Sequence, residues 1–281
     1  MTTTTAQRTR VQRAGVLAAL TVAAAVAGFP VAWMLISSFK TNTEVFAYPP
    51  RIITKGFSLD AYTAVLSDPT KLRFFLNSYL VALSVTLVTL VVAVLAAYAF
   101  SRYEFRGKGL VTTVIIGVQA VPPITLIIPY FSLIVALGLY NSYLGLILTY
   151  TVFTVPYAVI MMTSYFDTLP RELDEAVKVD GAGPLTALFR ILVPIALPGI
   201  VSVGVYTFMI AWNEYLFALT LTQTTDRRTL PIGIQLLLGQ TTQNWSELMA
   251  MSLLGILPVL VLFLLFQRWF IGGLTSGAVK S

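Results

Sequence analysis

The sequence contains neither cysteine nor histidine among its 281 residues. Without cysteine, the chain can form no disulfide framework, no thiolate metal site and no cysteine nucleophile. Without histidine, a serine–histidine–aspartate triad, a histidine-ligated zinc ion and the usual proton shuttle are excluded as well. These two absences remove the commonest kinds of enzyme active site, and we expect no catalytic residue and no metal site.

Charged residues are scarce too. They make up 11% of the chain, whereas a soluble domain carries about 25%. Hydrophobic residues make up 57%, and the mean hydropathy is +0.83. So few charges cannot cover the surface of a water-soluble chain of this size, and the composition predicts an all-α integral membrane protein. The net charge of +6 comes from scattered residues, which makes nucleic-acid binding a poor explanation of it.

Long apolar stretches are abundant. A bilayer core about 30 Å thick requires roughly 20 apolar residues in a helix. The sequence therefore predicts one membrane domain, residues 1–281, with six transmembrane helices. The predicted spans are Ala14–Ile36, Leu76–Phe100, Leu110–Leu137, Tyr143–Phe166, Leu197–Leu221 and Leu248–Phe270. The first span follows three arginines, as a signal peptide would, but its apolar run is too long for a cleaved one, so we expect a retained helix.

The orientation is predicted from lysine and arginine, which concentrate in cytoplasmic loops. With the N-terminus inside, the 18 basic residues divide into 11 on the inner side and 7 on the outer side. The contrast is sharpest between Ser101–Gly109, which holds three basic residues, and Gly138–Ser142, which holds none. We therefore expect both termini on the cytoplasmic side.

A polar segment, Asp167–Pro198, separates the fourth and fifth spans. Pro170 suits the first turn of a helix, where its missing N–H would be unbonded anyway. Leu173, Ala176 and Val177 follow at helical spacing and form one apolar stripe. Charged side chains occupy the rest of this helix surface: Glu172, Asp174, Glu175 and Lys178.

The same segment contains a second helical pattern. Gly181-Ala182-Gly183 is expected to end the first helix, because glycine accepts a left-handed conformation there. Pro184 is expected to begin the second helix, and Pro194 and Pro198 are expected to break the chain before the fifth span. The predicted apolar face of this second helix contains Leu185, Leu188, Phe189 and Leu192.

Two interpretations of this helix pair differ in what it contacts. An amphipathic helix can lie on lipid headgroups. Anionic lipid would repel the acidic residues of the first helix, so a protein partner explains the pattern better.

The residues of this segment resemble a family signature. Glu175-Ala176-Val177, three residues, Gly181, nine residues and Ile191-Leu192-Val193-Pro194 are similar to the E-A-A, three, G, nine, I-x-L-P pattern of ABC-importer permeases. Val177 and Val193 depart from it and stay apolar. In that family the segment is the coupling helix, which seats on a cytoplasmic ATPase. The resemblance implies that role for Glu172, Glu175, Ala176, Asp180, Gly181, Ala182 and Gly183.

Other motifs resemble the carbohydrate branch of that family, the maltose-type permeases. They are Ser38-Phe39-Lys40, Leu59-Asp60-Ala61-Tyr62, Asn77-Ser78, Leu137–Ser142, Trp212-Asn213-Glu214-Tyr215 and the ending Gly273–Lys280. The resemblance implies a type I ABC importer permease of six helices, which translocates a sugar or oligosaccharide across a bacterial or archaeal inner membrane. It also implies that the tail residues Thr275, Ser276 and Gly277 reach toward the ATPase.

The resemblance further implies partners: a second permease, two ATP-binding subunits and an extracytoplasmic solute-binding protein. The chain itself has no G-x-x-x-x-G-K-[ST] phosphate loop, because Gly107-Lys108-Gly109 lacks both the upstream glycine and the hydroxyl residue. We therefore expect no cofactor in this chain, and ATP and Mg²⁺ on the partner ATPase.

Three alternatives to a sugar importer stay open at this point. An importer of another solute, such as a polyamine or a glycerol phosphodiester, would carry the same cytoplasmic signature. A secondary carrier would be expected to show an inverted repeat and embedded coupling carboxylates, and this chain has no repeat and one marginal acid. An intramembrane enzyme is disfavoured by the lack of histidine, cysteine and any aspartate inside a span.

Three polar residues are candidates for a solute pathway. Glu214 lies about 17 residues into the fifth span, roughly 25 Å from its inner end. It is either a carboxylate at the outer interface or, with Asn213, a hydrogen-bonding group in a cavity. Gln119 precedes the prolines of the third span, which are expected to kink it; the kink either lines a pathway or serves packing.

Overall fold

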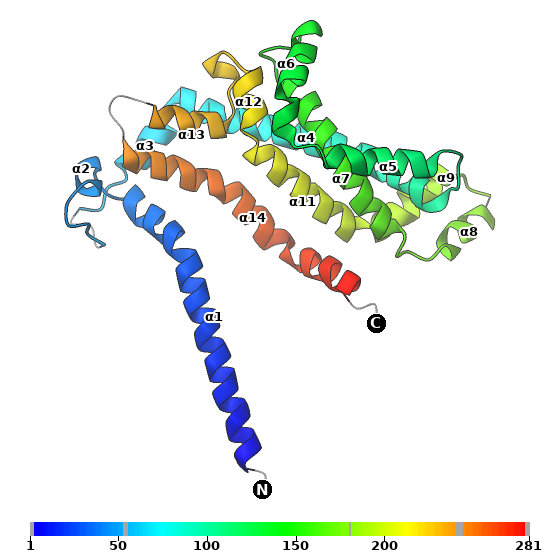
Figure 1. The fold of residues 1–281 in the computed structure, drawn as a ribbon, viewed down its shortest axis with the longest axis horizontal. Helices are drawn as coiled ribbons and strands as arrows, with labels where there is room; N and C mark the ends of the chain where they lie inside the picture. The colour runs from blue at the N-terminus through cyan, green and yellow to red at the C-terminus, as the bar shows by residue number, and fades with distance from the viewer. Residues whose placement is uncertain (1–2, 53–55, 180, 240–243, 279–281) are drawn as a thin grey trace. The chain divides into compact units, whose positions relative to one another are not determined.

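The computed structural model describes residues 3–52, 56–179, 181–239 and 244–278, and these ranges contain helices and turns but no strand. Contacts divide the chain into two compact units, Met1–Asp68 with Leu237–Leu254, and Pro69–Leu236 with Gly255–Ser281. The elements (Figure 1) are α1 (Thr3–Ser38), α2 (Asn42–Val45), α3 (Asp60–Leu66), α4 (Pro69–Arg102), α5 (Lys108–Gln119), η1 (Pro123–Leu126), α6 (Ile127–Ala136), α7 (Tyr143–Phe166), α8 (Glu172–Val179), α9 (Pro184–Thr186), η2 (Ala187–Leu192), α10 (Val193–Ile195), α11 (Leu197–Asn213), α12 (Leu216–Leu221), η3 (Thr225–Arg227), α13 (Leu230–Leu238) and α14 (Trp245–Ala278).

Four described helices are long and apolar enough to cross a membrane: Gln12–Ser38 of α1, α4, α7 and Trp245–Gln267 of α14. Two bent pairs of shorter helices raise the number to six if each pair forms one span. The fourth predicted span, Tyr143–Phe166, has the bounds of α7, and the first lies within α1. The predicted all-α membrane architecture is therefore confirmed.

The third predicted span, Leu110–Leu137, is broken rather than gently kinked. Its two parts, Lys108–Gln119 and Pro123–Ala136, meet at 96°. Pro122 and Pro123 have no N–H, so they cannot continue the hydrogen-bond ladder of α5. The prediction that prolines interrupt this span is confirmed, and the bend is far sharper than a kink within one helix.

The fifth predicted span, Leu197–Leu221, is right at its start and wrong toward its end. Helix α11 begins at Leu197 and ends at Asn213, and a separate helix, α12, begins at Leu216. Pro184–Ile195 and α11 form a bent pair that turns by 79° at a break before Leu197, which confirms the prediction that the chain breaks there. The apolar composition continues past Asn213, which is why a hydropathy reading joins α11 and α12.

The core of the second unit lies where α4 packs along α7 and α11. Small residues of α4, such as Ala93 and Ala97, are fully buried and let the helix backbones approach closely, as is typical of membrane helix interfaces. Buried residues of the helices and of η2 form one apolar cluster: Ala93, Val94, Ala97, Tyr98, Ala158, Val159, Met162, Phe166, Leu188, Leu192, Ala196 and Val203.

In the first unit, α1 is an apolar helix with almost no packing of its own. The most apolar 18-residue stretch of Gln12–Ser38 has a mean hydropathy of 2.0, and none of it is buried. A helix that is apolar on all sides is stable only where lipid or another apolar surface covers it. Its composition and exposure together indicate a lipid-facing helix.

Candidate functional site

The polar segment after α7 folds into one well-defined helix, α8. The carbonyl of Arg171 accepts the first amides, from Asp174 at 3.0 Å and from Glu175 at 3.3 Å. Acidic residues in the first turn stabilise the positive end of the helix dipole. Gly181 has φ +72°, and the amide of Ala182 donates to the carbonyl of Val177 at 3.1 Å. The prediction that Gly181 lies in a left-handed helix end is confirmed.

Helix α8 has two chemically different faces. Asp174 and Val177 are buried against the helix bundle, whereas Glu172 and Glu175 are exposed. Val179 is exposed as well. The exposed face therefore combines two carboxylates with an apolar side chain, which suits a protein partner better than water alone.

The buried face of α8 is joined to α4 by an ion pair. Arg102 Nε lies 2.8 Å from Asp174 Oδ2, with the two side chains 6% and 11% exposed. The Tyr98 hydroxyl donates to the other carboxylate oxygen, Oδ1, at 3.3 Å. Arg102 also donates through Nη2 to the carbonyl of Leu169 at 3.1 Å. A buried carboxylate requires partners of this kind, so the position of α8 relative to α4 is specified.

Two further hydrogen bonds join the end of α7 to the end of α4. The Ser101 hydroxyl donates to Asp167 Oδ1 at 2.6 Å, and Arg171 Nη2 donates to the carbonyl of Ser101 at 3.3 Å. The loop Ser101–Gly109 and the start of the polar segment therefore lie at the same end of the bundle. This agrees with the prediction that both are on one side of the membrane.

The second predicted helix is assembled from α9, η2 and α10. Leu188 and Leu192 of η2 are fully buried in the core cluster, whereas Leu185 and Phe189 are exposed. The prediction of one apolar face containing all four residues is therefore wrong. Leu185 and Phe189 are four residues apart, as are Leu188 and Leu192, so the two pairs follow adjacent stripes of the helical surface and only the second stripe faces the core.

The structure also places the other residues predicted to function in the polar segment and in the C-terminal tail. Pro170 precedes the helix by two residues, so the prediction that it occupies the first turn is wrong: Arg171 caps α8 instead. Gly183 is exposed at the start of α9, and the backbone of Ala176 lies within α8. Asp180 lies outside the described residues. The tail residues Thr275, Ser276 and Gly277 form part of the last turns of α14.

Glu214 is placed at the break between α11 and α12. Its Oε1 accepts the amide of Phe217 at 2.8 Å, and its Oε2 accepts the amide of Ala218 at 3.0 Å. Both carboxylate oxygens thus satisfy amides that the first turn of α12 leaves unbonded. The Tyr150 hydroxyl of α7 interacts electrostatically with the same carboxylate. The carboxylate acts here as a helix cap.

The two other pathway candidates lie at helix ends. Asn213 is the last residue of α11, is exposed, and donates through Nδ2 to the carbonyl of Met209 at 2.8 Å. Gln119 is the last residue of α5, next to the 96° break, and is exposed as well. The structure places each of these residues at an interruption of a predicted span.

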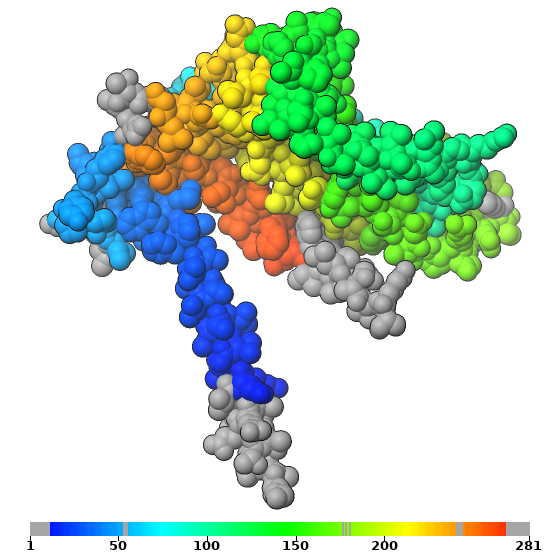
Figure 2. Space-filling model, viewed as in Figure 1, coloured from blue at the N-terminus to red at the C-terminus, as the bar shows by residue number. Residues whose placement is uncertain are grey.

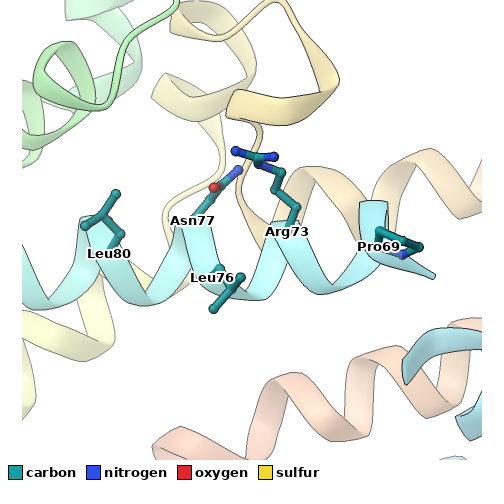
Figure 3. Close-up of a pocket in the computed structure, with 5 residues that line it drawn as sticks. All are labelled: Pro69, Arg73, Leu76, Asn77 and Leu80. Carbon is teal, nitrogen blue, oxygen red and sulfur yellow. The ribbon is translucent and has the colours of Figure 1, made fainter. Parts of the chain in front are cut away.

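A polar cluster at the opposite end of the bundle was missed as a site by sequence reasoning, although Asn77-Ser78 was noted as a motif. Asn77 Nδ2 donates to the carbonyls of Asp226 and Arg228 at 2.9 and 2.7 Å, and the Tyr143 hydroxyl donates to Asn77 Oδ1 at 2.7 Å. Figure 3 shows Asn77 and Arg73 directed to the same side of α4. Both residues line an open hollow of about 500 Å³. No local sequence pattern indicates contacts between residues so distant in the chain.

Asn141 ties the loop before α7 to the same region. Its Oδ1 accepts the amides of Gln223 and Thr224 at 2.9 and 3.1 Å, and its φ of 56° is one that asparagine tolerates. The pKa of the exposed Asp226 is lowered, mainly by a hydrogen bond from the Thr224 side chain. The loops predicted to be outside, Gly138–Ser142 and the one after the fifth span, therefore lie together.

The fold and these sites define the class of protein: a multi-pass helical membrane protein with a polar segment attached at one end of its bundle. Residues 89–270 match the family model described as the binding-protein-dependent transport system inner membrane component, and the chain belongs to this family. It is an ABC transporter permease, a transport component rather than an enzyme.

Relatives match over nearly the whole chain. The sulfoquinovosyl glycerol transport system permease protein SmoH of Agrobacterium fabrum is 38% identical over 252 residues, which are 90% of this chain and 88% of that protein. The trehalose/maltose transport system permease protein MalG of Thermococcus litoralis is 38% identical over 256 residues, 90% of this chain and 91% of that protein. The inner membrane ABC transporter permease protein YcjP of Escherichia coli is 37% identical, over 90% of this chain and 91% of that protein.

Solved structures share the fold. A chain of a bacterial ABC transporter involved in the import of the acidic polysaccharide alginate has a TM-score of 0.80 with 21% identity, covering 93% of this chain and 97% of that one. A chain of the MetNI methionine ABC transporter has a TM-score of 0.55 with 18% identity, covering 75% of this chain and 97% of that one. The predicted type I ABC importer permease fold is thereby confirmed.

Proposed function

We propose that this chain is a permease subunit that translocates a sugar or oligosaccharide, driven by a separate ATPase. The observation that carries the proposal is the agreement among relatives over about nine-tenths of the chain: their names specify sulfoquinovosyl glycerol, trehalose/maltose and arabinooligosaccharides. All three are glycosides with many hydroxyl groups. In this proposal residues 1–281 act as one permease together with a second permease, two ATP-binding subunits and an extracytoplasmic solute-binding protein.

The exposed face of α8 is the proposed ATPase contact. Glu172 and Glu175 present charge on this face, and the exposed apolar side chains of Val179, Leu185 and Phe189 supply area that a partner would bury. Exposed apolar groups beside polar ones are typical of protein interfaces. In the same proposal Ala176 and Asp180–Gly183 complete the contact, Thr275–Gly277 approach the ATPase, and ATP and Mg²⁺ stay on that subunit.

The attachment of α8 explains how movement would reach the membrane helices. A displacement of α8 acts on α4 through the Arg102–Asp174 ion pair, and on the core cluster through Leu188 and Leu192 of η2. Close-packed interiors transmit displacement because they resist compression. The permease would thus change between two arrangements as the ATPase pair closes and opens.

The solute pathway is proposed to use polar groups at the helix breaks. Gln119 and Asn213 have exposed amides that can hydrogen-bond sugar hydroxyls. Glu214 would contribute by capping α12. The cap separates α12 from α11 and so leaves Asn213 at the break. The cytoplasmic side is proposed for both termini and for the end of the bundle that holds α8.

Uptake by the complete transporter tests this function. The permease, its partner permease and the ATPase are reconstituted in vesicles loaded with ATP, with the proton gradient collapsed and the solute-binding protein added. Labelled trehalose, maltose and arabinooligosaccharides are compared with a polyamine and a glycerol phosphodiester. ATP-dependent uptake of a sugar is expected. The proposal would be contradicted if the polyamine or the phosphodiester were taken up and no sugar were. It would also be contradicted if uptake needed the proton gradient and no ATP.

A further inference from the structure

The connection between α1 and α3 folds back to its starting point. The amide of Ser58 donates to the carbonyl of Phe39 at 2.9 Å, and the rings of Phe39 and Phe57 stack with centroids 4.6 Å apart. Phe39 directly follows the last residue of α1, Ser38. The connection therefore begins and ends beside the terminus of an apolar helix.

A buried lysine holds the middle of this connection against α1. Lys40 is 3% exposed, its ammonium donates to the carbonyl of Arg51, and it lies 4.8 Å from the ring centroid of Trp33 in α1. A buried ammonium is stabilised only by partners such as a carbonyl and an aromatic face. These contacts keep Arg51 close to the last turns of α1.

A second apolar helix is tied to the same connection. Helix α14 begins at Trp245, whose amide donates to Asn42 Oδ1 at 3.0 Å. The ring of Phe46 packs edge-on against that of Trp245, with centroids 6.5 Å apart. Helix α1 ends and helix α14 begins near Asn42. The depth of this connection relative to the membrane is therefore set by the ends of two membrane-crossing helices.

Apolar side chains at this level are left exposed. Phe46 is 62% exposed despite its contact with Trp245, Tyr48 is 95% exposed and Ile52 is 67% exposed. Arg51 is exposed between them. In Figure 2 the chain that follows α1, up to the grey residues, is drawn in lighter blue than α1 and lies at the surface.

We infer that Phe46–Ile52, the interfacial segment, is embedded in the lipid headgroup layer where α1 ends. Amphipathic aromatic side chains such as tyrosine favour the boundary between headgroups and acyl chains. An arginine side chain beside them can reach the lipid phosphates. The segment would thereby fix the depth of α1, whose most apolar stretch is not buried by any described residue.

A spin label tests this inference, because the chain has no cysteine to interfere. A nitroxide is attached to Tyr48→Cys in the complete transporter, with any cysteines of the partner subunits replaced, in nanodiscs of phosphatidylethanolamine and phosphatidylglycerol. Collisions with oxygen, which partitions into lipid, are compared with collisions with a water-soluble nickel chelate. Val26→Cys, exposed on α1, is the lipid control, and Thr225→Cys, exposed in a turn, is the water control.

The oxygen-to-nickel ratio at position 48 is expected to exceed the ratio at position 225 severalfold and to approach that at position 26, with or without the solute-binding protein. A ratio equal to that at position 225 would overturn the inference. So would a ratio that rises only when the solute-binding protein is added, because that result assigns the segment to a protein partner.

Discussion

At the scale of single residues, Asp174 determines how α8 is attached to the helix bundle. A carboxylate with 11% of its side chain exposed loses most of its hydration, and Arg102 and Tyr98 replace that hydration with an ion pair and a hydrogen bond. Such a pair contributes little net stability compared with apolar residues of the same volume, but removal of one partner leaves a buried charge alone. The role of this ion pair is to specify where α8 lies against α4.

Removal of one member of this pair should be more damaging than removal of both. Arg102→Met and Asp174→Leu are each expected to destabilise the protein by about 3–5 kcal/mol, because one charge stays buried without its partner. The double variant should regain a large part of that loss. Thermal unfolding of the four purified proteins measures this coupling. Additive effects of the two substitutions would show that the ion pair does not hold α8.

Gly199 makes a second residue-scale prediction. A Cβ at this position would lie 2.6 Å from the ring of Tyr165, so the close approach of α11 and α7 requires glycine. Gly199→Val should therefore destabilise the protein by about 1–3 kcal/mol through overpacking. Gly117→Ala is the matched control, because a Cβ there meets nothing within 4 Å. Equal melting temperatures for the two variants would contradict the packing described.

At the scale of secondary-structure elements, two interruptions shape the fifth span. The break before Leu197 follows from Pro194 and Pro198, which cannot donate to the helix ladder. The break at Glu214 has a different cause, since glutamate is a good helix former. Here the side chain accepts two amides of α12 and so replaces two bonds that a continuous helix would have made.

Substitution of Glu214 should therefore act on helix α12 in proportion to the oxygens removed. Glu214→Gln keeps one acceptor oxygen, whereas Glu214→Leu keeps none and leaves two amides unbonded, at about 1–3 kcal/mol for each buried group. Leucine should lower the melting temperature more than glutamine. Asn213→Ala, next to the break and exposed, should change stability by about 0.5 kcal/mol or less. Equal stability of Glu214→Leu and the natural protein would rule out the cap.

The sequence predicted those elements whose cause is local. Hydropathy located α7, and the conformational freedom of glycine located the end of α8 at Gly181. Prediction from the sequence failed where a distant or unusual contact determines the structure. The cap by Glu214 is invisible to an average over 20 residues, and only packing against the core cluster separates buried Leu188 from exposed Phe189. Asn77 contacts a loop about 150 positions later in the chain, so no spacing rule could identify it.

At the scale of the whole second unit, the loops gather at the two ends of the bundle. Ser101 contacts Asp167 at one end, whereas Asn141 contacts Gln223 and Asn77 contacts Asp226 at the other. Charge asymmetry assigned the first end to the cytoplasm and the second to the outside, and the contacts group the loops in the same way. Sidedness itself stays a prediction.

Single cysteines determine that sidedness. Arg106→Cys and Thr225→Cys are both exposed and lie at opposite ends of the bundle. An impermeant maleimide applied to intact cells should label position 225, and should label position 106 only after the membrane is permeabilised. The reverse pattern would invert the topology and place α8 on the side away from the ATPase.

The proposed function requires the exposed face of α8 to dock on the ATPase and to transmit its movement, and a reversible cross-link at Glu175 measures this directly. In the reconstituted transporter, Glu175→Cys should form a disulfide with a cysteine placed in the ATPase surface, and Thr225→Cys should not. Cross-linking should stop ATP-driven uptake, and reduction should restore it. If no ATPase position cross-links to residue 175, and Glu175→Lys and Gly181→Val transport normally, α8 is not the coupling element.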